Sequence, residues 1–252
     1  MPGYDLIATA QVPEGGELRL VQRGSEFSIL LDCTELMSTS ASASEEALAT
    51  MTCARLADVD APDLLIGGYG MGYTLRAALA ALGPAASVTV AELVPDIIAW
   101  AKGPMHALTA RGLCDPRVQL VQDDVAMLID AARNGYDAIL LDVDNGPEGL
   151  TRCVNDHLYT AEGLQAVWLA LKPGGILAVW SAFPDPTFTR RLVDKGFEVT
   201  EAPVRELSGE RGAHHIIWFA QKLHEGSCVT DAAPEDPDAI WRTMPQRHKC
   251  HS

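Results

Sequence analysis

The chain has 252 residues, a length that suits one large domain or a domain with a small appendage. Hydrophobic residues make up 48% of the chain, so it can bury a sizeable core and global disorder is excluded. The 34 Asp and Glu residues outnumber the 19 Lys and Arg residues, which gives a formal net charge of -15. Because such a surface repels phosphate backbones and anionic headgroups, we expect neither nucleic acid nor a membrane as a partner.

The amino terminus has neither the basic start nor the apolar run of a signal peptide, and no segment is apolar enough for a transmembrane helix. The six cysteines are scattered without a CxxC pair, which is typical of free thiols in a reducing compartment. We therefore expect a cytoplasmic protein. No metal site is expected either, since the His and Cys residues of the last 30 positions match no zinc-binding spacing.

The first part of the chain, residues 1–42, is predicted to form a small β region. Two runs of alternating apolar residues, 17–22 and 26–31, flank a turn centred on Gly24 and predict a hairpin. The segment 42–57 then predicts a helix that Ser44 caps, with Glu45 and Glu46 in its first turn.

From Asp63 onward, short apolar strands alternate with helical segments. This alternation predicts an α/β, Rossmann-like doubly wound sheet of seven mostly parallel strands. The last two strands have no helix between them and predict an antiparallel hairpin at the sheet edge. The chain would then divide into the β region 1–42, a Rossmann-like domain 43–222 and an extended tail 223–252. The predicted strands are 63–68, 87–93, 117–124, 136–144, 175–182, 197–204 and 214–221, and the predicted helices are 74–82, 95–108, 125–134, 161–171 and 186–196.

Ligands of open parallel sheets bind outside the carboxyl ends of the strands, so the residues that follow each strand are candidates for a site. Glycines follow the first strand and acidic residues follow the next three. A GxGxG loop lets a ligand approach the backbone closely, although the same pattern also suits a turn without a ligand. An acid 20 positions after the last glycine can accept two hydrogen bonds from a ribose, although a solvated charge is the ordinary alternative. These candidates are Gly68, Gly70 and Gly72, then Glu92, then Asp123 and Asp124, then Asp142 and Asp144.

The motifs in this order resemble those of class I S-adenosylmethionine-dependent methyltransferases, and more narrowly their spermidine synthase-like branch. The matching segments are "GGYGMGYTLRA", "ELVPDII", "DPRVQLVQDD", "LLDVDNGPEGL" and "LYTAEGL", followed by "LKPGG". The resemblance covers about residues 5–222. It implies a nucleoside-binding Rossmann-like fold with an N-terminal β region, and it also implies a homodimer.

The resemblance also implies a role for each candidate residue. The three glycines would pass beneath S-adenosylmethionine, and Glu92 would hold its ribose hydroxyls. Asp124 would accept a hydrogen bond from the adenine amino group, with Val125 packing on the ring. Asp142 would lie beside the sulfonium and the incoming acceptor, and Asp142 or Asp144 would orient the acceptor or take its proton. The alternative for Asp142 is a structural cap on the following loop.

One departure from the branch decides between two transferase reactions. Its glycine loop carries an aspartate that is implicated in holding the charged aminopropyl donor, whereas this loop reads Tyr69, Gly70, Met71. The sequence therefore favours a methyltransferase that uses S-adenosylmethionine and a small, cationic acceptor. The alternatives are a polyamine aminopropyltransferase using decarboxylated S-adenosylmethionine, and a non-catalytic nucleoside-binding module. Glu45 or Glu46 would face a substrate amine, or else serve in a helix cap.

Overall fold

The computed structural model describes residues 3–13, 15–143, 156–205 and 214–223. Its first element is a separate antiparallel sheet of four strands in the order β1-β2-β3-β4. The predicted hairpin is confirmed, because β2 and β3 pair from Leu18 opposite Leu31 to Arg23 opposite Glu26. The two outer strands were not predicted. The bounds are β1 Asp5–Gln11, β2 Glu17–Arg23, β3 Glu26–Leu31 and β4 Thr34–Ser38.

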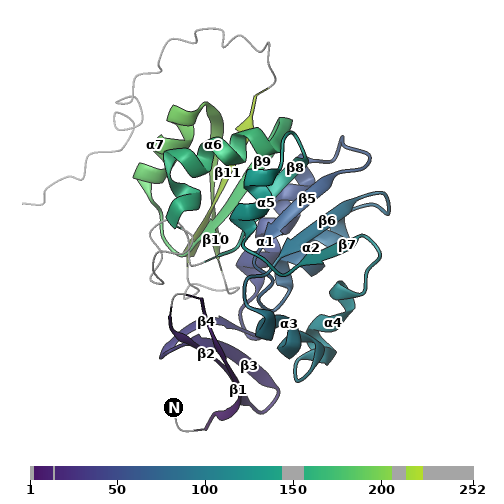
Figure 1. Cartoon of the computed structure of the whole chain (residues 1–252), viewed down its shortest axis with the longest axis vertical. Helices are drawn as coiled ribbons and strands as arrows, with labels where there is room; N and C mark the ends of the chain where they lie inside the picture. Colours follow the sequence, from purple (N-terminus) through teal and green to yellow (C-terminus); the bar gives the residue numbers. More distant parts are fainter. Residues whose placement is uncertain (1–2, 14, 144–155, 206–213, 224–252) are drawn as a thin grey trace, which may run out of the picture.

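The second sheet has seven strands in the order β10-β11-β9-β8-β5-β6-β7 (Figure 1). Pairs from β9 to β7 are parallel, and β10 and β11 form the antiparallel hairpin at the edge, so the predicted fold class is confirmed. Chain order reverses at β5, which places the topological switch point between β5 and β8. The bounds are β5 Asp63–Gly67, β6 Ser87–Ala91, β7 Val118–Val121, β8 Tyr136–Leu141, β9 Leu171–Ser181, β10 Phe197–Arg205 and β11 His214–Lys222.

Helices cover both faces of this sheet. Leu48, Leu75 and Ile98 from α1, α2 and α3 belong to the core on one face, and Ile129 and Leu164 from α5 and α6 belong to the core on the other. None of the helices in the described residues is both long and apolar enough to cross a membrane. The bounds are α1 Ala43–Arg55, α2 Tyr73–Ala81, α3 Pro95–Lys102, α4 His106–Leu113, α5 Val125–Ala131, the 3-10 helix η1 Asp156–Tyr159, α6 Ala161–Ala170 and α7 Pro186–Lys195.

Two local predictions are wrong. The single helix expected over 95–108 is two helices, α3 and α4, because α3 ends at Lys102 with Gly103 as its C-cap, and Pro104 has no N–H to continue it. Ser44 does not cap α1; the N-cap residue is Ser42, and Ser44 is buried inside the first turn. The predicted tail 223–252 lies, apart from its first residue, outside the described residues.

Candidate functional site

Backbone hydrogen bonds at the carboxyl edge of the sheet place several predicted site residues side by side. The N–H of Asp142 donates to the carbonyl of Gly67 at 3.1 Å, and the N–H of Gly68 donates to the carbonyl of Ala91 at 2.9 Å. The N–H of Glu92 donates to the carbonyl of Val121 at 3.0 Å. These bonds extend the parallel pairing by one residue beyond the strands. Asp142, Gly68 and Glu92 therefore follow one another along the edge, at the switch point.

The three glycines of the loop have backbone conformations that other residues rarely adopt. Their φ angles are 86°, 53° and 72° for Gly68, Gly70 and Gly72. A Cβ at Gly68 would lie 2.5 Å from the carbonyl oxygen of Asp142, and one at Gly70 would lie 2.8 Å from Cε of Met37. Packing of the loop against the protein itself thus requires glycine, whether or not a ligand passes over it.

The side chains between the glycines hold the loop in place. Tyr69 is 4% exposed, and its hydroxyl donates to the carbonyl of Thr109 at 3.0 Å. Met71 is 1% exposed, and its N–H donates to Sδ of Met37 in β4 at 3.0 Å. The small sheet therefore contacts the glycine loop directly. Neither loop side chain offers a charge to a ligand.

Glu92 is buried, with 5% of its surface exposed, and its carboxylate binds the backbone of two loops. Oε2 accepts from the N–H of Tyr69 at 2.9 Å, and Oε1 accepts from the N–H of Val94 at 2.8 Å. Burial raises the pKa of Glu92, and hydrogen bonds from backbone N–H groups oppose that rise. Glu92 thus has a structural role in holding the glycine loop, and its contact with ribose hydroxyls stays a prediction.

Asp124 and Val125 begin α5, beside the end of β7. Asp124 is the N-cap residue, and its Oδ1 accepts from the N–H of Ala126 at 2.8 Å. Val125 is 5% exposed and packs toward Gly67, where a Cβ would meet its Cγ2 at 3.0 Å. Both residues thus have a structural role, and their contact with adenine stays a prediction.

Asp142 lies beside the start of the glycine loop, where a Cβ at Gly68 would come within 2.5 Å of its backbone carbonyl oxygen. Its Oδ2 accepts from the hydroxyl of Thr74, in the first turn of α2, at 2.7 Å. Desolvation raises the pKa of Asp142 to about 6, while the Thr74 hydrogen bond lowers it. A carboxylate with this pKa is mostly ionised at neutral pH and can still take up a proton. Asp144, the second predicted catalytic residue, lies outside the described residues.

Two residues around Asp142 were missed or left undecided by the sequence. Thr74 was not singled out, because nothing in the local sequence indicates that its hydroxyl reaches Asp142. Glu45 was named together with Glu46, and only Glu45 is buried, with 7% exposure. The alternation of exposed and apolar positions along α1 was the signal that could have separated the two.

Comparison with known proteins gives the family. Residues 46–194 match the sequence model of the family described as "Spermine/spermidine synthase domain". The chain belongs to this family. The polyamine aminopropyltransferase of Mycobacterium tuberculosis strain H37Rv is 31% identical over 183 residues, which are 69% of this chain and 32% of that protein. Polyamine aminopropyltransferase 1 of Streptomyces coelicolor is 32% identical over 124 residues, 48% of this chain and 22% of that protein.

Solved structures of the family share the fold. Spermidine synthase from Thermotoga maritima has a TM-score of 0.67 at 20% identity, covering 86% of this chain and 72% of that chain. A probable spermidine synthase from Corynebacterium glutamicum has a TM-score of 0.59 at 17% identity, covering 86% and 81%. The chain thus spans most of these solved chains but about a third or less of the two curated relatives.

These matches overturn the main functional prediction. The methyltransferase hypothesis, with S-adenosylmethionine as methyl donor, is wrong, because the family and both relatives are named for polyamine synthesis and aminopropyl transfer. The alternative drawn from the same resemblance, an aminopropyltransferase, agrees with the comparisons. The error came from the glycine loop, where the missing aspartate was weighed above the rest of the motifs.

Proposed function

We propose that the chain transfers an aminopropyl group from decarboxylated S-adenosylmethionine to a primary amine of a small cationic acceptor. The observation that carries the proposal is the desolvated carboxylate of Asp142, beside the glycine loop at the switch point of a spermidine synthase fold. Glu92 would accept from the ribose hydroxyls, and Asp124 and Val125 would flank the adenine. The glycine loop would support the remainder of the donor.

The reaction is an in-line displacement. The lone pair of the acceptor amine forms a bond to the aminopropyl carbon next to the sulfonium, and the carbon–sulfur bond breaks. Its electron pair stays on sulfur, which leaves as the neutral thioether of 5′-methylthioadenosine. The amine proton passes to Asp142, whose carboxylate is the general base, and then to water. The protein contributes mainly by holding both reactants at attack distance away from water.

A coupled product assay tests the proposal. The purified chain is incubated with decarboxylated S-adenosylmethionine and 1,4-diaminobutane, and 5′-methylthioadenosine and the extended amine are measured by mass spectrometry. We expect the two products in equal amounts, and a loss of about a hundredfold or more in Asp142→Asn, because the general base is removed. Absence of 5′-methylthioadenosine with the decarboxylated donor would rule the proposal out.

A further inference from the structure

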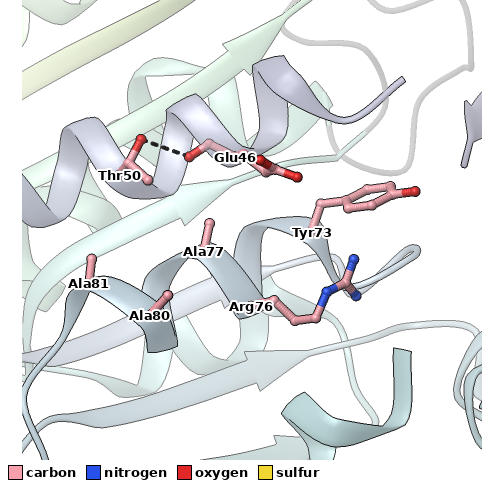
Figure 2. Close-up of a pocket in the computed structure, with 7 residues that line it drawn as sticks. All are labelled: Glu46, Thr50, Tyr73, Arg76, Ala77, Ala80 and Ala81. Carbon is pink, nitrogen blue, oxygen red and sulfur yellow. Dashed lines mark hydrogen bonds between the residues drawn. The ribbon is translucent and has the colours of Figure 1, made fainter. Parts of the chain in front are cut away.

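A groove of about 420 Å³ lies between α1 and α2 (Figure 2). Both helices begin at the same end of it, because Thr74 Oγ1 in the first turn of α2 lies 3.5 Å from the carbonyl oxygen of Glu45 in the first turn of α1. Sites for small molecules have volumes of about 300 to 1,000 Å³, so the groove is large enough for one. None of the described residues that line it belongs to the predicted nucleoside-binding set. The groove is therefore distinct from the proposed active site.

One end of the groove carries a cation and a carboxylate. Arg76 of α2 and Glu46 of α1 lie there, beside the ring of Tyr73, as Figure 2 shows. In the part of the chain that the structure describes, neither Arg76 nor Glu46 belongs to an ion pair. A ligand that carries one negative and one positive group would supply the counter-charge of each.

Arg76 and Glu46 are held in position by the protein. Nη1 of Arg76 donates to the carbonyl of Met71 at 2.7 Å, and the guanidinium lies 4.8 Å from the centroid of the Tyr73 ring. Oε1 of Glu46 accepts from the hydroxyl of Ser42 at 2.9 Å. A guanidinium has five N–H donors and a carboxylate has two oxygens, so both groups can make further hydrogen bonds. Side chains that are already fixed lose less entropy when a ligand binds.

The other end of the groove is apolar. Ala77, Ala80 and Ala81 of α2 line it, and Thr50 of α1 lies across from them (Figure 2). The hydroxyl of Thr50 donates to the carbonyl of Glu46 at 2.9 Å, so it is satisfied within its own helix. Ala80 and Ala81 are exposed. Methyl groups leave room for an apolar ligand group of a few carbons, and burial of that group would favour binding.

We propose that this groove binds an α-amino acid with an apolar side chain. The carboxylate of the amino acid pairs with Arg76, its ammonium pairs with Glu46, and its side chain lies on the alanines. The match is one of arrangement, because both charges of an amino acid lie next to the carbon that bears its side chain. A simple amine would leave Arg76 without a counter-charge, and a simple carboxylate would do the same to Glu46. This binding does not depend on aminopropyl transfer, since it uses none of the residues assigned to that reaction.

Three ligands that differ by one charge test the proposal. L-leucine, L-leucinamide and N-acetyl-L-leucine share a side chain, but leucinamide lacks the carboxylate and the acetyl derivative lacks the ammonium. NMR titration of the isotope-labelled full chain measures the affinity and, from the amides that shift, the place of binding. We expect L-leucine to shift amides of α1 and α2 along the groove. We expect the other two ligands to bind at least about fivefold more weakly.

Variants then assign each charge to its residue. Glu46→Gln should weaken L-leucine at least about fivefold without weakening N-acetyl-L-leucine, which has no ammonium to lose its partner. Glu162→Gln is the matched control, because Glu162 is also an exposed glutamate in the first turn of a helix, α6. Arg76→Gln should weaken L-leucine without weakening leucinamide.

A steric variant keeps the test decisive if Arg76→Gln does not fold. Ala80→Leu fills the apolar end and should weaken all three ligands, whereas Ala99→Leu, at an exposed position of α3 outside the groove, should bind as the wild type does. No binding of L-leucine by the wild type, equal affinity for L-leucine and either derivative, or equal effects of Glu46→Gln and Glu162→Gln would overturn the proposal.

The transfer assay distinguishes failure of this proposal from failure of the proposed function. A wild type that binds L-leucine in the groove but forms no 5′-methylthioadenosine would refute aminopropyl transfer alone. A wild type that transfers the aminopropyl group but does not bind L-leucine would refute the amino acid site alone.

Discussion

Replacing the proposed general base should make the protein more stable at neutral and alkaline pH. Desolvation raises the pKa of Asp142 from 3.8 to about 6, so the folded chain holds the proton more tightly than the unfolded chain does. Between these two values the unfolded state loses its proton first, and the free energy of unfolding falls as the pH rises. Asp142→Asn has no charge to bury and keeps an oxygen that accepts from Thr74.

The size of the effect follows from the pKa shift. One pKa unit corresponds to about 1.4 kcal/mol, so ionisation of Asp142 costs the folded state roughly 3 kcal/mol once the pH exceeds 6. We expect the free energy of unfolding of Asp142→Asn to exceed that of the wild type by up to about this amount at pH 8. The two proteins should have similar stability near pH 4, where Asp142 of the wild type is protonated in the folded state.

Urea denaturation at both pH values measures this difference, with Asp60→Asn as the control. Asp60 is exposed, so its variant removes the same charge from the acidic surface without removing a desolvated carboxylate. We expect the control to change the free energy of unfolding by less than about 0.5 kcal/mol. Two results would refute the desolvation of Asp142. One is an Asp142→Asn variant that is no more stable than the control at pH 8, and the other is a gain in its free energy of unfolding at pH 4 as large as the gain at pH 8.

Three further predictions concern the same edge of the sheet. The value of kcat/KM for aminopropyl transfer should fall as the pH drops below about 6, since only ionised Asp142 takes the proton; a profile flat from pH 5 to 8 would contradict this. Gly68→Ala, with φ at 86° and a Cβ 2.5 Å from a carbonyl oxygen, should lose about 2 kcal/mol or more of stability in urea, whereas Gly83→Ala, with open space around it, should lose little. Met37→Leu removes the sulfur that accepts from the N–H of Met71, and it should lower the free energy of unfolding by about 1 kcal/mol. Met51 is also partly buried, so Met51→Leu is the control and should lower it less; equal losses in the two variants would exclude a role for the sulfur.

The Rossmann-like sheet could be predicted because its information is local. Segments such as 63–68 and 87–93 are continuous apolar runs between helical segments, which is how a parallel strand covered on both faces is recognised. The carboxyl ends of these strands then placed Gly68, Glu92 and Asp142 at one edge before any contact was known. Strand β1 was not predicted because its residues are mostly exposed. Strand β4 was not predicted because it is short and only one of its residues is buried.

The contacts that give the site its chemistry join residues far apart in the chain. Thr74 reaches Asp142 across 68 positions, and Met71 reaches Met37 across 34. No local pattern specifies such pairs, because each partner satisfies a helix or strand on its own. Burial likewise separates Glu45 from Glu46 only once α1 is packed on the sheet.

The glycine loop shows why one position is a weak guide to the reaction. Tyr69 and Met71 turn inward and fix the loop against Thr109 and Met37, so this loop cannot supply a carboxylate for a charged substrate. A cationic substrate must then find its counter-charge on other elements, and Asp142 at the end of β8 places a carboxylate beside Thr74, in the first turn of α2. Functional prediction therefore needs the packed site rather than the loop motif alone.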